Sequence, residues 1–93
     1  MAVSIHIPTP LRTYTDGNAT VAVDGATVGD ALNALTTRYP GLAKNLRSPD
    51  GKLRSFVNVY LGEEDIRFLQ REATPVAEGA ELTIVPSIAG GVS

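Results

Sequence analysis

Residues 79–93 read GAELTIVPSIAGGVS, and this stretch decides how the chain is organised. The β-branched run at residues 82–85 predicts a closing strand, and Gly90 and Gly91 follow it closely. Glycine loses more backbone entropy on ordering than any other residue and has no side chain to pack. A segment without Cβ atoms is also slim enough to enter a narrow slot on another protein. The ending therefore predicts a carrier whose working group is a backbone carboxylate on a thin tail.

Two residues, Val92 and Ser93, follow that pair of glycines. As encoded, the carbonyl of Gly91 belongs to an amide and is not an acid. A working carboxylate at Gly91 therefore requires cleavage between Gly91 and Val92. We expect the form that retains Val92 and Ser93 to be inert in any chemistry at Gly91.

Further strands are predicted upstream of this ending. Residues 3–7 alternate between apolar and polar types, as in a half-buried strand, and the prolines that follow end it. Residues 20–23 predict a second strand, antiparallel to the first across turn residues 15–18. Residues 56–61 form the strongest strand pattern, followed by an acidic turn at 62–65 and a short returning strand at 66–68.

One helix is predicted between the second and third strands. Thr27 is suited to its N-cap, and Asp30 lies three residues later, where a carboxylate can reach back to the cap. The helix is expected to end at Pro40 and Gly41, and Leu42 and Leu46 to add a short turn over the edge of the core. Its apolar stripe, assigned to the core, comprises Val28, Ala31, Leu32, Leu35 and Tyr39.

These elements predict an α+β fold in a single domain of residues 1–86, followed by a flexible tail at 87–93. One helix cannot cover both faces of a sheet, so we expect a mixed, curled sheet of four to five strands around it. The other sheet face is expected to be largely solvated. The first and last strands are expected to lie side by side at the centre.

Composition and charge exclude several classes of protein. The 93 residues carry a net charge of −2, and only Lys44, Arg47, Lys52 and Arg54 form a basic group. A nucleic-acid binder normally has a denser basic face with interleaved aromatics, so none is expected here. No apolar run reaches the roughly 20 residues of a membrane span, and the N-terminus has no signal-peptide pattern. We expect a soluble cytoplasmic protein.

The chain contains no cysteine. This excludes disulfides, cysteine-ligated metal centres and thiol catalysis within the chain. If the protein handles sulfur, no side chain can hold it as a thiol or persulfide. The sulfur would have to sit on the chain terminus.

The order of elements and the Gly-Gly pair resemble the β-grasp, ubiquitin-like sulfur carriers of the ThiS and MoaD type. The stretch at residues 57–68, with its acidic turn, and residues 5–12 resemble the cysteine-pathway branch of that family, the CysO type. Residues 79–86 resemble the family's approach to its tail, and residues 88–91 its hydrophobic-x-Gly-Gly ending. The resemblance spans nearly the whole chain.

The resemblance implies a carrier that is not itself an enzyme and has no catalytic or metal-binding residue. An E1-like enzyme would adenylate the Gly91 carboxylate with ATP, and sulfur would displace AMP to give a thiocarboxylate. Ile88, Ala89 and Gly90 would thread into the enzyme. A JAMM-type metalloprotease would cleave between Gly91 and Val92, and a PLP-dependent cysteine synthase would accept the sulfur. No cofactor is expected on the carrier itself.

Other functions remain open at this point. The alternative sulfur acceptors belong to thiamine, molybdopterin or thio-containing secondary metabolite synthesis. A protein modifier linked through Gly91 to lysines would share the activation step and differ in its fate. An interaction domain without terminal chemistry would keep Val92 and Ser93.

Several local features favour structural roles. His6 lies on a strand with no second histidine, which favours a surface or hydrogen-bonded residue. The consecutive acids at 63–65 favour a solvated hairpin tip over a metal or acid–base site. The glycines match no phosphate-binding loop, since no Gly-Lys-Ser/Thr follows them. The candidates for partner docking are Phe56, Tyr60, Phe68 and Pro86.

Overall fold

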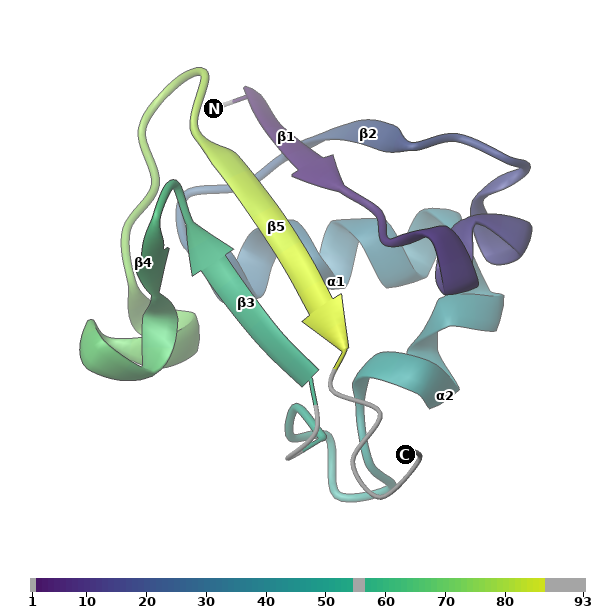
Figure 1. Ribbon diagram of the computed structural model, residues 1–93. Coiled ribbons are helices and arrows are strands. Elements are labelled where there is room, and N and C mark those ends of the chain that lie inside the picture. Colours follow the sequence, from purple (N-terminus) through teal and green to yellow (C-terminus); the bar gives the residue numbers. More distant parts are fainter. Residues whose placement is uncertain (1, 55–56, 87–93) are drawn as a thin grey trace.

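The fold is a five-stranded mixed sheet wrapped around one main helix (Figure 1). The computed structural model describes residues 2–54 and 57–86. The strands are β1 (Ala2–His6), β2 (Thr20–Asp24), β3 (Val57–Leu61), β4 (Glu64–Asp65) and β5 (Glu81–Pro86), in the spatial order β2-β1-β5-β3-β4. The predicted α+β, β-grasp class is confirmed.

The two ends of the described chain meet at the centre of the sheet. β1 and β5 pair in parallel, with Ile5 opposite Leu82, while β1 pairs antiparallel with β2 and β3 antiparallel with β5. The predicted adjacency of the first and last strands is confirmed, as is the antiparallel pairing of the first two. β5 therefore has a strand partner on each side.

The main helix, α1 (Val28–Arg38), crosses one face of the sheet (Figure 1). Thr27 is its N-cap: the Asp30 amide donates to Thr27 Oγ1 at 3.1 Å, and Asp30 Oδ2 accepts from the Ala26 amide at 3.4 Å. These reciprocal bonds satisfy amides at the helix start. The predicted start and end of the helix are confirmed, with Tyr39 as C-cap before Pro40.

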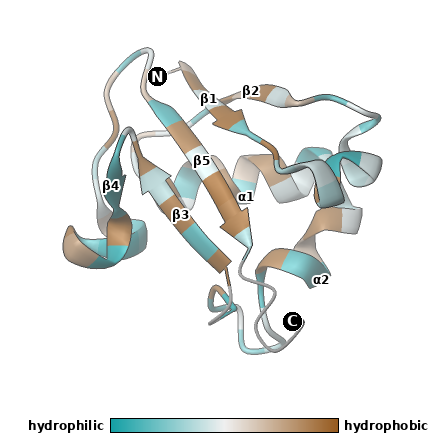
Figure 2. Cartoon of the chain, in the orientation of Figure 1, coloured by the Kyte–Doolittle hydropathy of each residue, from teal (hydrophilic) through white to brown (hydrophobic). Residues whose placement is uncertain are grey.

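The core lies between α1 and the inner face of the sheet. Strand residues alternate between buried and more exposed positions, which Figure 2 shows as alternating colours along β3 and β5. Leu42 and Leu46, from the 3₁₀ turn η2 (Pro40–Leu42) and the short helix α2 (Ala43–Leu46), close one edge and are fully buried, as predicted. The predicted helix stripe is buried at Val28, Ala31, Leu32 and Leu35 and partly buried at Tyr39.

The predicted returning strand at residues 66–68 is wrong. The returning strand is β4, two residues earlier, because the turn consists only of Gly62 and Glu63, with Gly62 at φ +62°. Ile66–Phe68 forms the 3₁₀ turn η3, capped by Asp65, whose Oδ1 accepts from the Arg67 amide at 2.9 Å. The side-chain cap ends the strand, a competition that residue propensity does not reveal.

Further 3₁₀ turns fill the connections. The longest, η1 (Thr9–Thr15), begins after Pro8, and Thr15 is buried with its hydroxyl donating to the carbonyls of Arg12 and Asn18. The last, η4 (Arg71–Ala73), lies beside α1. Within residues 2–54 and 57–86, no helix is long and apolar enough to cross a membrane.

Replacement of Leu35 tests the assignment of the helix face. Leu35 is fully buried, so Leu35→Ala is expected to lower the free energy of unfolding by about 2–5 kcal/mol. Thr37→Ala, at an exposed position of the same helix, is expected to change it by less than about 0.5 kcal/mol. Urea unfolding at neutral pH measures both, and equal effects would contradict this orientation of α1.

Candidate functional site

The candidate site is the end of β5 and the sheet face around it. Pro86, the last described residue of the strand, lies opposite Val57 of β3 and is partly buried. Ile88, Ala89, Gly90, Gly91, Val92 and Ser93 lie outside the described residues, so their predicted roles stay predictions. The structure places Pro86, the end of β5, after which these residues follow in the sequence.

β5, the strand that ends at Pro86, is held by two neighbouring strands and by the hydrophobic core. β5 pairs with β1 at residues 81–83 and with β3 at residues 82–86. Leu82 and Ile84 point into the core and are at most 1% exposed. Because loosening β5 would expose core side chains and break two ladders, Pro86 is a firm anchor for the residues that follow it.

The outer face beside β5 is mostly polar and open, with Glu81 at its margin. Thr83 lies opposite Tyr60 and Val85 opposite Asn58, and this face includes Ser4 of β1. Val85 is 41% exposed, unusual for a valine in a central strand. Few charges are present to desolvate here, so the face suits docking of another protein. The predicted solvated sheet face is confirmed.

His6 and Glu81 lie at the margin of this face. The Nε2 atom of His6 lies 2.8 Å from Glu81 Oε1, and its Nδ1 lies 3.4 Å from Thr20 Oγ1. Both ring nitrogens therefore have partners on neighbouring strands. The prediction of a hydrogen-bonded strand residue is confirmed. Among residues 2–54 and 57–86, no group of three or more His, Asp or Glu side chains is suitable for holding a metal ion.

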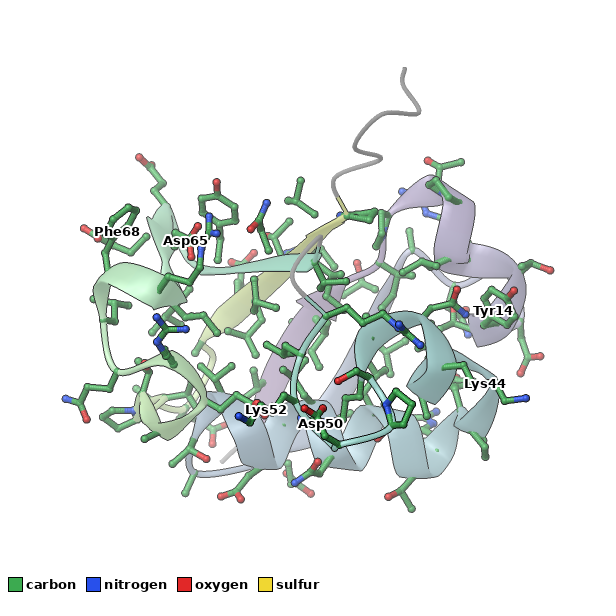
Figure 3. All side chains as sticks on the ribbon, turned by 90° about the horizontal axis from the view of Figure 1, so that it is seen from below. Tyr14, Lys44, Asp50, Lys52, Asp65 and Phe68 are labelled. Atoms are coloured by element: carbon green, nitrogen blue, oxygen red, sulfur yellow. The ribbon has the colours of Figure 1, made fainter. Side chains whose placement is uncertain are left out.

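The predicted docking residues do not form one surface. Tyr60 is on the outer sheet face, whereas Pro86 occupies an inward-facing position of β5, in alternation with Leu82 and Ile84. Phe68 is on η3 at the sheet edge and is 82% exposed. Figure 3 shows it at the margin of the molecule, seen from below. Phe56 lies outside the described residues. The docking role of all four stays a prediction.

Sequence reasoning missed Val85 and Thr83 as surface residues beside the end of β5. The run of β-branched residues at 82–85 hid the alternation. The signal that identifies them is phase: once Leu82 and Ile84 are inside, Thr83 and Val85 must be outside.

The acidic hairpin differs from the predicted solvated tip. Glu63 and Glu64 are exposed, but the side chain of Asp65 is only 6% exposed. Its Oδ2 accepts a hydrogen bond from Arg67 Nη2 at 2.8 Å. The side-chain hydrogen bonds from Arg67, with the bond from the Arg67 amide, hold the pKa of Asp65 below its ordinary value. Asp65 is therefore a structural cap that orients η3.

Three comparisons relate the chain to known proteins. The model of the ThiS family matches residues 5–91. The chain is 42% identical over 93 residues to the sulfur carrier protein CysO of Mycobacterium tuberculosis, covering 98% of this chain and 100% of the relative.

Structural similarity agrees with that match. The structure of the BexX/CysO complex of Amycolatopsis orientalis superposes with a TM-score of 0.86 at 40% identity, covering 96% of this chain and 99% of the other. Small archaeal modifier protein 1 of Haloferax volcanii is 41% identical over 78 residues, covering 81% of this chain and 85% of the relative.

Removal of the Asp65 charge tests the cap. Because the folded pKa is depressed, the carboxylate stabilises the fold above its unfolded pKa of about 3.9, and this is lost as the pH falls through the folded value. Asp65→Ala is expected to lower stability at neutral pH by about 1 kcal/mol and to flatten the loss below about pH 4. Thermal unfolding against pH measures it. Glu64→Ala, at an exposed neighbour, serves as control, and an equal effect there would refute the cap.

Proposed function

The chain belongs to the ThiS family, and from this membership we propose that it is a sulfur carrier whose Gly91 carboxylate is converted to a thiocarboxylate. Sulfur carriers of the CysO type are substrates of enzymes and not enzymes themselves. The observation that carries the proposal is that the family match ends at Gly91, five residues beyond the anchored end of β5.

The chemistry follows from the properties of a carboxylate. A free carboxylate is a poor electrophile, so an E1-like enzyme joins it to AMP from ATP and releases pyrophosphate. Hydrosulfide then attacks the acyl carbon and AMP leaves, which gives a thiocarboxylate. That group is anionic and nucleophilic at neutral pH. It needs no cysteine, in agreement with a chain that has none.

The body supplies position rather than catalysis. Residues 87–91 span at most roughly 17 Å when extended. The outer face around Tyr60, Thr83 and Val85 docks on the enzyme surface, and Ile88, Ala89 and Gly90 thread toward a recessed centre. A side chain at Gly90 or Gly91 would widen this thread.

Activation requires a free Gly91 carboxylate, so we propose cleavage between Gly91 and Val92 by a JAMM-type metalloprotease. The sulfur acceptor we propose is a PLP-dependent cysteine synthase. Support for the cysteine pathway is the similarity to CysO over nearly the whole chain. A body that binds partner proteins is supported by the likeness to a CysO solved in complex with BexX.

Mass spectrometry tests the activation step. With activating enzyme, ATP and sulfide, a chain ending at Gly91 is expected to exchange one oxygen for sulfur, whereas the encoded chain is unchanged. Gly90→Val should slow the exchange at least about tenfold by blocking the thread, with stability altered by less than about 0.5 kcal/mol. Ser87→Val adds a similar side chain outside the threaded residues and is the control. Exchange in the encoded chain with Val92 and Ser93 retained would refute the proposal.

A second candidate function is protein modification. The similarity to small archaeal modifier protein 1 favours it, since the activation step is shared. The expected product is an isopeptide bond between Gly91 and a lysine of a target protein. Proteolysis of host extracts followed by mass spectrometry would detect branched peptides that carry the tail on lysine. Their absence, with thiocarboxylate present, would leave sulfur transfer alone.

A further inference from the structure

A groove of about 630 Å³ lies at the β3 edge of the sheet and shares Asn58 with the outer face. Its buried apolar wall comprises Val57, Val59 and Ile66, which carry the inward phase of the sheet or begin η3. Leu53, from the connection before β3, adds a partly buried side chain. The groove therefore joins the hydrophobic core to the surface at a place where the sheet has an edge.

The strand in the wall of this groove is only half paired. β3 pairs with β5 along its length but with β4 only at Tyr60 and Leu61. Within the described ranges 2–54 and 57–86, no strand pairs with residues 57–59 on the groove side, although the Val57 amide already donates to the Arg54 carbonyl at 3.0 Å. An edge of this kind can accept an extended peptide as an added strand.

Exposed cations surround the opening. Lys52, Arg67 and Arg71 line it, and Arg67 is engaged by Asp65. The one carboxylate in the lining is that of Glu72, which is bound by Arg47 at 2.6 and 3.2 Å. In the part of the chain that the structure describes, no carboxylate lies within ion-pair distance of Lys52 or Arg71. Lys52 and Arg71 thus bring positive charge to the groove without a close ion pair, on a chain of net charge −2, although Asp65 acts on Arg71 at longer range.

The backbone at Arg71 is held in an unfavourable conformation. Its φ is +54°, in the left-handed region that is unfavourable for a residue with a Cβ atom. The surrounding loop holds it: the Thr74 amide donates to the Arg71 carbonyl at 3.1 Å, and Thr74 Oγ1 accepts from the Gln70 amide at 2.9 Å. Thr74 is buried, so the loop presents Arg71 to the groove from a fixed base.

We propose that this groove binds an extended acidic segment of a partner protein, which adds to the open edge of β3. Carboxylates of the segment pair with Lys52 and Arg71, and its alternate apolar side chains contact Val57, Val59 and Ile66. Charge complementarity selects this occupant over a neutral or basic peptide. The site requires nothing of Gly91, so it stands or falls separately from the sulfur-transfer proposal.

Peptide titration tests the groove. The probe is a blocked peptide of alternating Glu and Val, added to the full ¹⁵N-labelled chain at low ionic strength, where surface charges are least screened. We expect amide shifts at Val57, Asn58 and Val59. Combined Lys52→Glu and Arg71→Glu should weaken binding at least about tenfold, since two ion pairs become repulsions. A Lys-Val peptide of equal length should not bind.

Lys44→Glu is the matched control for charge. Lys44 is exposed on α2, and Figure 3 shows it at the opposite end of the view from Phe68. Its reversal should weaken binding less than about twofold. If the charge-reversed variant does not fold, the double variant Lys52→Gln, Arg71→Gln replaces it. This milder variant should also weaken peptide binding more than Lys44→Glu does.

The absence of amide shifts at peptide saturation would overturn the proposal, as would shifts on the outer face at Ser4, Thr83 and Val85 instead of at the groove. An affinity loss in Lys44→Glu equal to that of the double reversal, or binding of the Lys-Val peptide as tight as that of the Glu-Val peptide, would overturn it too. Concentration-dependent dimerisation that fills the groove, seen by sedimentation without peptide, would also overturn it. Binding that persists in Gly91→Val would confirm that the groove acts independently of the terminus.

Discussion

The parallel pairing of β1 with β5 is the constraint on which the rest of the structure depends. It brings the last strand into the centre of the sheet, where β3 pairs with its other side and α1 covers its inner face. The final strand therefore has a partner on each side as far as Pro86. The proposed chemistry falls to the residues that follow it in the chain.

Separation of the two surfaces follows from the same arrangement. The outer face around Thr83 and Val85 belongs to the central strands, whereas the cationic groove belongs to the short edge at β3 and β4. β4 is only two residues long because Asp65 turns the chain into η3. That one carboxylate therefore orients η3 beside the groove and, by ending β4, leaves the edge of β3 open.

The sequence predicted the fold where its signals were local or periodic. Thr27 and Asp30 mark the helix start by their chemistry, and the alternation in the early strand identifies its buried side. The returning strand could not be predicted, because a side-chain cap at Asp65 outweighs the β propensity of Ile66 and Phe68. The groove could not be predicted either, since Lys52 and Arg71 meet only through tertiary structure. The role of the terminal glycines stays a prediction that rests on their composition and position in the sequence.

The parallel pair also has a consequence for synthesis on the ribosome. Ser4 of β1 pairs with Glu81, so the centre of the sheet cannot close until residues 81–86 have been made. Contacts of such long sequence separation slow folding, because loop closure precedes the energy it releases. Until then the inward side chains of β1 and β3 lack their neighbour. A nascent chain that stalls before β5 therefore leaves apolar surface exposed, which is the kind of surface that chaperones bind.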